Sequence, residues 1–368
     1  MMGADGKNEL AKHGGDLRTL ATRSGRSLED ILDFSASINP LGLPEWLREV
    51  VDAHLGEIAH YPDPHCRELV AAVCEKYPVA PAEVVVGNGS TELLYLLPRA
   101  LPAKRVLTLE PGYVDYARAA QVAGLPLERV MLREDRLFAL DFGDLEDRLQ
   151  AADLVVVGRP NNPTGGACEA HALRSLARRR PDCWFAADEA FADFMVRPDT
   201  LIENRPENLI VVRSLTKFYA IPGLRLGYAV ADEAVATEAR GFVLPWSVNS
   251  LSQAVGTAAL RDKAYAQAAR QYVSRQKARL SAKLGDMRAL TVFPSQANFL
   301  LVRVEREGFD AHQLARQLLE DGIAIRTCDD FCGLDRRYFR VAVRTQEEQA
   351  RLLGSLRVAL GESDARPA

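Results

Sequence analysis

The chain has 368 residues, of which 48% are hydrophobic and 26% charged, with a formal net charge of -4 at pH 7. This length and composition predict one large globular domain plus a smaller one, and the lack of net positive charge argues against nucleic acid or an anionic membrane as a partner. No apolar run is long enough to span a membrane and the first residues lack a signal-peptide core, so we expect a cytoplasmic protein. The six cysteines are scattered without metal-ligand spacing, so we expect reduced thiols and no metal site.

The N-terminal part is predicted to be an arm, residues 1–44, that packs on the smaller domain. It combines a polar start, a weakly amphipathic stretch at 17–24 and a Pro- and Gly-containing loop at 34–44. Pro44 is well placed to begin a helix at 45–55, and Pro62 and Pro64 form a rigid corner before a helix at 67–77.

From residue 83 strands and helices alternate. Strands are expected at 83–86, 105–109, 127–132, 154–158, 184–187, 209–212 and 227–230, and helices at 91–100, 113–123, 145–151 and 170–179. Apolar strands without alternation are typical of a mostly parallel sheet with helices on both faces. We therefore predict an α/β large domain over residues 45–262, whose ligands bind beyond the carboxyl ends of the strands.

The pattern changes after residue 262. A long charged helix is expected at 263–284, followed by strands at 290–293, 298–304, 323–326 and 338–343 and helices at 311–319 and 347–360. This pattern predicts a small α+β domain over residues 263–368.

Lys217 lies in a loop directly after the predicted strand 209–212. Its apolar neighbours would desolvate the ammonium and favour the neutral amine that forms a Schiff base. Ser214, Thr216 and Arg225 add two hydroxyls and a planar cation, a set suited to a phosphate ester. A phosphate beside such a lysine indicates pyridoxal phosphate, although a lysine in a strand-end loop is also compatible with a plain surface residue.

Other strand ends carry residues that suit the same cofactor. Ser90 and Thr91 open a helix whose backbone N–H groups can bind an anion, Asn162 can donate to a ring hydroxyl, and Asp188 can pair a pyridinium nitrogen. Each also has an ordinary structural explanation, as a helix cap, a turn residue or a capped turn.

Two tyrosines, Tyr113 and Tyr116, follow another strand end and offer an aromatic face for a planar cofactor or simple core packing. Because all these candidates lie at strand ends of one predicted sheet, their convergence favours a pyridoxal-phosphate site.

The motifs together resemble a known family. They are similar to motifs of fold-type I pyridoxal-phosphate enzymes of the aspartate aminotransferase superfamily. The stretches that carry the resemblance are FSASINPLGLP at 34–44, YPDP at 61–64, GNGSTE at 87–92, PNNPTG at 160–165, DEAF at 188–191, SLTK at 214–217 and YFRVAVR at 338–344. Within it, the chain resembles the branch shared by histidinol-phosphate aminotransferases and L-threonine-O-3-phosphate decarboxylases. The resemblance extends over nearly the whole chain, from about residue 13 to 360.

The resemblance implies a role for each cofactor-site residue. Lys217 would carry the cofactor and move protons at Cα, Asp188 would pair the pyridine nitrogen, and Asn162 would bond the ring oxygen. The phosphate would be held by Ser90, Thr91, Ser214, Thr216 and Arg225, while Tyr113 would stack on the ring. Tyr61 would reach the cofactor phosphate of a second subunit, which implies a homodimer with shared active sites.

The resemblance also implies a small phosphorylated amino acid as substrate. Arg340 matches the arginine that binds the α-carboxylate, and His13, Asn39, Arg326 and Arg344 are further substrate-binding candidates. How carboxylate and phosphate are divided among the cations stays open at this stage.

The reaction implied first is decarboxylation of L-threonine O-3-phosphate to (R)-1-aminopropan-2-yl phosphate and CO2, a step of cobalamin biosynthesis. Phe191 favours it, because the aminotransferases usually have a tyrosine there, and so do the HGG at 13–15, the FSASINPLG stretch, the FCGL at 331–334 and Arg344. Transamination of histidinol phosphate or another amino acid is the alternative. A decarboxylase of serine phosphate and a non-catalytic binding protein are further alternatives.

Overall fold

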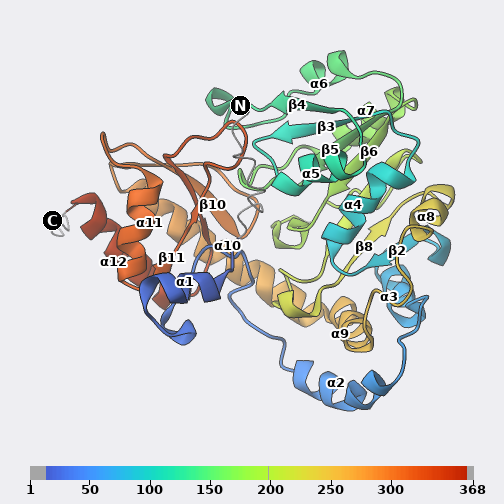
Figure 1. Cartoon of the computed structure of the whole chain (residues 1–368), viewed down its shortest axis with the longest axis horizontal. Coiled ribbons are helices and arrows are strands. Elements are labelled where there is room, and N and C mark those ends of the chain that lie inside the picture. Colours follow the sequence, from blue (N-terminus) through green and yellow to red (C-terminus); the bar gives the residue numbers. More distant parts are fainter. Residues whose placement is uncertain (1–13, 198, 363–368) are drawn as a thin grey trace, which may run out of the picture.

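The computed structural model of the chain describes residues 14–197 and 199–362. Figure 1 shows a large sheet flanked by helices beside a smaller unit formed by the C-terminal elements. The large sheet has seven strands in the order β2 (Val84–Gly87), β8 (Gly227–Val230), β7 (Leu209–Ser214), β6 (Trp184–Asp188), β5 (Asp153–Gly158), β3 (Arg105–Glu110), β4 (Leu127–Met131). Only the pairings of β8 with β2 and β7 are antiparallel. The predicted mostly parallel α/β sheet is confirmed.

Both faces of this sheet are buried, which explains its continuous apolar strands. On β5, Val155 and Val157 pack into one core while Leu154 and Val156 pack into another, because successive side chains point to opposite faces. The first core is covered by α3 (Arg67–Lys76), α6 (Phe142–Arg148), α7 (Ala170–Arg179) and α9 (Ser250–Arg261). The second is covered by α4 (Ser90–Ala100), α5 (Val114–Val122) and α8 (Glu233–Arg240).

The smaller unit is built on an antiparallel sheet in the order β12 (Arg326–Thr327), β13 (Tyr338–Ala342), β10 (Phe299–Val304), β9 (Leu290–Val292). Helices α11 (Ala311–Glu320) and α12 (Gln346–Leu360) pack against it around a separate apolar core. The long helix α10 (Lys263–Gly285) joins the two units, since Val273 lies in the large core and Leu280 in the small one.

The N-terminal segment contacts the smaller unit. Helix α1 (Leu17–Ser24) lies near α11 (Figure 1), and β1 (Leu32–Asp33) pairs in parallel with β11 (Ile323–Ala324). Phe34 is fully buried in the small core. Helix α2 (Leu47–His54) then turns to the large unit and packs on α9. The domain boundaries at residues 44 and 262 remain predictions.

Some local expectations differ from the structure. The strand expected at 323–326 is two short strands in different sheets, β11 and β12, because the chain leaves β1 after Ala324 and joins β13 at Arg326. The helix expected at 145–151 begins at Phe142, since the Asp141 carboxylate accepts from Gly143 N and Asp144 N. Short 3-10 helices are found at η1 (Leu28–Asp30), η2 (Leu55–Ala59), η3 (Pro81–Glu83), η4 (Glu134–Arg136), η5 (Ala192–Phe194) and η6 (Pro222–Leu224). Within the described ranges, no helix is both long and apolar enough to cross a membrane.

Candidate active site

Lys217 follows the carboxyl end of β7, where a hydrogen-bonded loop fixes its position. Its amine donates to Ser214 Oγ at 3.2 Å, and Ser214 Oγ lies 2.8 Å from Thr216 Oγ1. From the N-terminal segment, Asn39 N donates to Lys217 O at 3.0 Å and Asn39 Nδ2 donates to Phe218 O at 2.7 Å. The lysine backbone is therefore held from two sides.

The surroundings of Lys217 favour a neutral amine. Burial lowers the pKa of Lys217 to about 8, Arg225 and Arg340 act in the same direction, and the Asp188 carboxylate opposes them. The Phe191 ring centroid lies 5.7 Å from Nζ and presents an apolar surface. About a tenth of the amine population is thus unprotonated at pH 7, far more than at the ordinary lysine pKa, and the neutral amine is the form that attacks an aldehyde.

Asp188 ends β6 and is buried, with 7% of its surface exposed. Its Oδ2 accepts from the Tyr116 hydroxyl at 2.7 Å and its Oδ1 accepts from Ala190 N at 3.0 Å. Burial raises the pKa of the Asp188 carboxyl, whereas the Tyr116 hydrogen bond and the Lys217 charge oppose that rise. Among the described residues, no arginine or lysine forms an ion pair with this carboxylate, so it suits a protonated ring nitrogen.

A tight backbone cradle for an anion lies where β2 leads into α4. Gly89 has φ +86°, and a Cβ there would lie 2.6 Å from Arg225 Nη2. A Cβ on Gly227 would lie 2.5 Å from Ser90 N, so the neighbouring strand also approaches the helix start closely. Gly89 has no side chain that could cap α4, so no N-cap side chain bonds the backbone N–H groups at the start of this helix. The helix start at Ser90 and Thr91 therefore suits a phosphate beside the Arg225 cation.

A cavity of about 220 Å³ opens between the two units in front of these groups. It is lined by loops of the N-terminal segment, the large sheet and the small unit: Gly14, Ser35, Ala36, Ser37, Ile38, Thr91, Tyr113, Val114, Asn162, Phe191, Lys217, Arg225, Arg326, Phe331 and Arg340. Burial raises the pKa of the partly buried Tyr113, whose hydroxyl interacts with Thr91 and Asp115.

Two buried arginines reach this cavity from the small unit. Arg340, on β13, donates to the Asn162 Oδ1 atom and to Ser35 O, and burial lowers its pKa to about 10. Arg326, on β12, pairs with Asp330 at 2.6 Å. Within the described residues, Arg340 Nε and Ser37 Oγ are buried without hydrogen-bond partners. The cavity therefore offers positive charge and unsatisfied donors to an anionic ligand.

Seven predicted site residues within the described ranges are not part of the cavity lining: Ser90, Asp188, Ser214, Thr216, Asn39, Tyr61 and Arg344. His13 lies outside the described residues. Tyr61 is 80% exposed and stacks on Trp246 with ring centroids 4.6 Å apart. Asn39 is buried and donates to the backbone of Lys217 and Phe218, so it holds the lysine loop, and its substrate contact remains a prediction.

Arg344 also lies outside the cavity lining. Its Nη2 donates to Glu348 Oε1 at 2.5 Å, on the first turn of α12. This ion pair turns the guanidinium toward the helix start, because Glu348 belongs to the capping box with Thr345. The substrate role of Arg344 therefore remains a prediction.

Behind the site, Glu189 is the centre of a buried ion network that was not predicted. Its Oε1 accepts from Arg159 Nη1 at 3.1 Å and from Leu201 N at 2.9 Å, and its Oε2 accepts from Arg213 Nη1 at 2.8 Å and from Thr200 Oγ1 at 2.7 Å.

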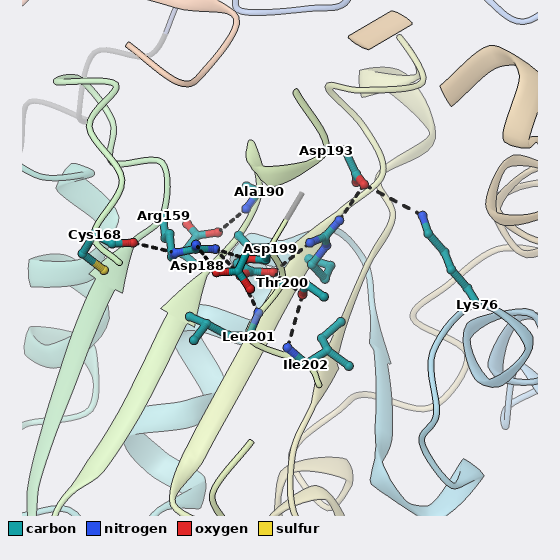
Figure 2. Close-up of polar contacts among 12 residues, drawn as sticks. Lys76, Arg159, Cys168, Asp188, Ala190, Asp193, Asp199, Thr200, Leu201 and Ile202 are labelled. Atoms are coloured by element: carbon teal, nitrogen blue, oxygen red, sulfur yellow. Dashed lines mark hydrogen bonds and ion pairs between the residues drawn. The ribbon is translucent and has the colours of Figure 1, made fainter. Parts of the chain in front are cut away.

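Figure 2 shows this network extending to Asp193 and Lys76, and Arg213 Nη2 lies 2.7 Å from Asp193 Oδ1. Its donors come from the loop after β5, from β7 and from the loop after η5, so only the assembled sheet could reveal it. A sequence signal existed only in part, as the charged pair of Asp188 and Glu189 after an apolar strand.

Comparisons with known proteins identify the family. The family model for aminotransferase class I and II matches residues 29–356. The chain belongs to this family. It is 39% identical over 353 residues to the threonine-phosphate decarboxylase of Salmonella typhimurium, covering 95% of this chain and 96% of the relative. It is 31% identical to histidinol-phosphate aminotransferase 2 of Ralstonia nicotianae, covering 96% and 95%. The solved structure of a Sinorhizobium meliloti histidinol-phosphate aminotransferase in complex with pyridoxal 5′-phosphate superposes with a TM-score of 0.84, at 23% identity and 96% coverage of both chains.

Members of this family depend on pyridoxal phosphate, and the residues of this chain fit that cofactor. The fit rests on the cradle at Gly89, which a Cβ would obstruct, on the depressed pKa of Lys217 and on the buried Asp188 carboxylate. We propose that Lys217 binds the cofactor aldehyde, Asp188 pairs the ring nitrogen and Asn162 contacts the ring oxygen. Tyr113 would cover the ring, while the phosphate would lie among Ser90, Thr91, Ser214, Thr216 and Arg225.

The structure adds residues that the sequence did not single out as site residues. Ser35 and Ser37 line the cavity from the N-terminal segment, and Phe331 lines it from the loop after β12. The alternation of the two serines in the FSASINP stretch was a sequence signal for both of them. Tyr116 was considered as a stacking ring, but its hydroxyl donates to Asp188.

Proposed function

We propose that this protein decarboxylates L-threonine O-3-phosphate to (R)-1-aminopropan-2-yl phosphate in cobalamin biosynthesis. The observation that carries the choice is the 39% identity to a threonine-phosphate decarboxylase along almost the full length of both chains, against 31% for an aminotransferase. The chain is also 33% identical, over 94% of its length, to the bifunctional adenosylcobalamin biosynthesis protein CobDQ of Leptospira interrogans.

The charges of the cavity are consistent with a doubly anionic substrate. Arg326 and Arg340 both line it, and so do Ser35 and Ser37. A phosphorylated amino acid carries a carboxylate and a phosphate, each of which an arginine binds well through paired N–H donors. Arg326 and Arg340 would divide these two anions between them.

The chemistry needs a group that accepts the electron pair left on Cα when the bond to the carboxylate breaks. Bound pyridoxal phosphate supplies this group through its electron-withdrawing ring. The side chains that hold the substrate anions decide which bond at Cα is aligned for cleavage. Lys217 then delivers a proton to Cα after CO2 has left, and its depressed pKa suits proton transfer near neutral pH. Phe191 shields this step from water, since its ring lines the cavity beside Nζ.

The test is CO2 release from the purified protein with pyridoxal phosphate and O-phospho-L-threonine, with no keto acid present. We expect one aminopropanol phosphate for each CO2, and no CO2 from the Lys217→Ala variant. O-phospho-L-serine in parallel measures the contribution of the substrate methyl group, which we expect to be worth ~1–3 kcal/mol in kcat/KM. Absence of CO2 from the wild-type protein would refute the proposal.

Transamination remains the second candidate, supported by the 31% identity to a histidinol-phosphate aminotransferase over nearly the whole chain. It requires an amino donor that converts the bound cofactor to its amine form. Accumulation of that form on addition of histidinol phosphate, together with no CO2 from phosphothreonine, would assign the protein to the aminotransferases.

We also propose that the protein acts as a homodimer with shared active sites. Tyr61 is 80% exposed, its ring stacks on the half-exposed Trp246, and Leu244 nearby in sequence is 70% exposed. Such exposed aromatic and aliphatic side chains are typical of an interface that a partner covers. Light scattering should give twice the monomer mass, and Tyr61→Ala should weaken pyridoxal phosphate binding if Tyr61 reaches the second subunit's cofactor.

A further inference from the structure

The Tyr116 hydroxyl bonds directly to the carboxylate that faces the cofactor. Tyr116 lies on α5 and is 4% exposed, and its hydroxyl lies 2.7 Å from Asp188 Oδ2. The other oxygen, Oδ1, is fixed by Ala190 N at 3.0 Å, a bond that Figure 2 shows. Each oxygen thus has one protein donor and keeps a further acceptor position, because an ionised carboxylate can accept about four hydrogen bonds.

The position of the hydroxyl is set by packing. Gly158, at the end of β5, leaves the necessary room, since a Cβ there would lie 3.1 Å from the Tyr116 hydroxyl oxygen. The Tyr116 ring meets Tyr113 edge to face, with centroids 5.5 Å apart and planes at 84°. Because both neighbours restrict the ring, the hydroxyl remains directed at Asp188.

We infer that Tyr116 is a positioning residue that orients the Asp188 carboxylate and keeps it ionised, so that the cofactor ring nitrogen stays protonated. The inference rests on the cofactor site proposed above and holds for decarboxylation and transamination alike.

The charges around Asp188 explain why this hydrogen bond matters. Lys217 faces it from the loop after β7, and Glu189 adjoins it on its own turn. Glu110, at the end of β3, faces the Tyr116 side. Burial and Glu189 favour the protonated acid, whereas Tyr116 and Lys217 favour the carboxylate. The Lys217 charge is present only while the amine is free and protonated, but the Tyr116 hydroxyl can donate in every state.

The experiment uses Tyr116→Phe, which removes only the hydroxyl. The holoenzyme is prepared with pyridoxal phosphate labelled with ¹⁵N in the ring, and the ring-nitrogen chemical shift is measured by NMR. We expect a protonated nitrogen in the wild-type protein and a shift toward the neutral form in the variant, with a dissociation constant for the cofactor about ten-fold higher.

The matched control is Tyr95→Phe. It removes a tyrosine–aspartate hydrogen bond of similar length, 2.6 Å to Asp115 Oδ1, at a carboxylate other than Asp188. We expect it to leave the ring-nitrogen signal unchanged. A loss of packing stability alone would affect both variants alike, so the difference between them isolates the role of Tyr116.

A second variant, Gly158→Ala, would bring a Cβ to 3.1 Å from the Tyr116 hydroxyl oxygen and to 2.9 Å from Asn161 Oδ1, so it crowds both side chains. It should move the ring-nitrogen signal in the same direction, which keeps the test decisive if Tyr116→Phe does not fold. An unchanged, protonated signal in the folded variants would overturn the role of Tyr116 alone. A wild-type protein that gives no bound signal would overturn the cofactor site and this inference with it. The decarboxylation assay separates this inference from the proposed function: CO2 release with an unchanged ring-nitrogen signal in the variants overturns the inference alone, and a protonated bound cofactor without CO2 release overturns the proposed function alone.

Discussion

Replacing Glu189 by glutamine should destabilise the protein through its two buried arginines. Glu189 is 1% exposed, and its carboxylate accepts from Arg159 Nη1 at 3.1 Å and Arg213 Nη1 at 2.8 Å. Glutamine keeps the shape of the glutamate side chain but removes its negative charge. Each carboxylate oxygen of Glu189 accepts from two donors, so the amide NH₂ of glutamine would face one of these two pairs. Removal of one partner from a buried ion pair costs ~3–5 kcal/mol. Since Arg213 retains Asp193 at 2.7 Å, we expect the lower end, a loss of about 3 kcal/mol in the free energy of unfolding.

Urea unfolding of the wild-type and variant proteins, followed by circular dichroism, measures this loss. The matched control is Glu146→Gln, which removes a two-pronged pair with Arg179 whose side chains are 32% and 52% exposed. We expect the control to change the unfolding free energy far less, because exposed ion pairs are well solvated. A Glu189→Gln variant as stable as the control would refute the view that this carboxylate holds the arginines.

Three further predictions concern the site itself. The rate at which pyridoxal phosphate attaches to the apoenzyme should rise with pH with a half-maximum near pH 8, because half of the free Lys217 amine is neutral at its lowered pKa of about 8. A half-maximum near the ordinary lysine pKa of 10.5 would contradict the burial argument. Gly89→Ala should weaken cofactor binding more than Gly124→Ala. Both glycines have a positive φ, but only a Cβ at position 89 would contact a guanidinium group, that of Arg225. Equal cofactor affinities in the two variants would show that the close approach at Gly89 is not part of the phosphate site. Arg326→Ala should lower kcat/KM for phosphothreonine by about ten- to a hundred-fold, as expected for loss of a hydrogen bond to a charged group. Arg344→Ala should change kcat/KM little, because its guanidinium pairs with Glu348. Steady-state kinetics with the reverse order would support a substrate role for Arg344 and contradict the one given to Arg326.

The order of strands and helices in the large unit was predictable because it follows from local hydrophobic pattern. The strand that ends in Asp188 and the strand before Lys217 are apolar along their length, and both lie inside the sheet. The segment at 323–326 was mispredicted as one strand, since apolar pattern alone does not show that its two halves pair with different partners.

The sequence by itself determined the set of chemical groups at the strand ends. Lys217, Asp188, Asn162 and Arg225 were identifiable because polar residues that follow apolar parallel strands meet at one edge of the sheet. Their fit to pyridoxal phosphate depends on residue type and strand position, both of which the chain states directly.

Only the tertiary structure decided where the remaining side chains point. Asn39 and Arg344 belong to stretches that resemble substrate-binding motifs, yet one bonds the backbone of the Lys217 loop and the other pairs with Glu348. Tyr116 donates to Asp188, 72 positions along the chain. Such contacts depend on distances between elements far apart in sequence, and local pattern carries no information about those distances.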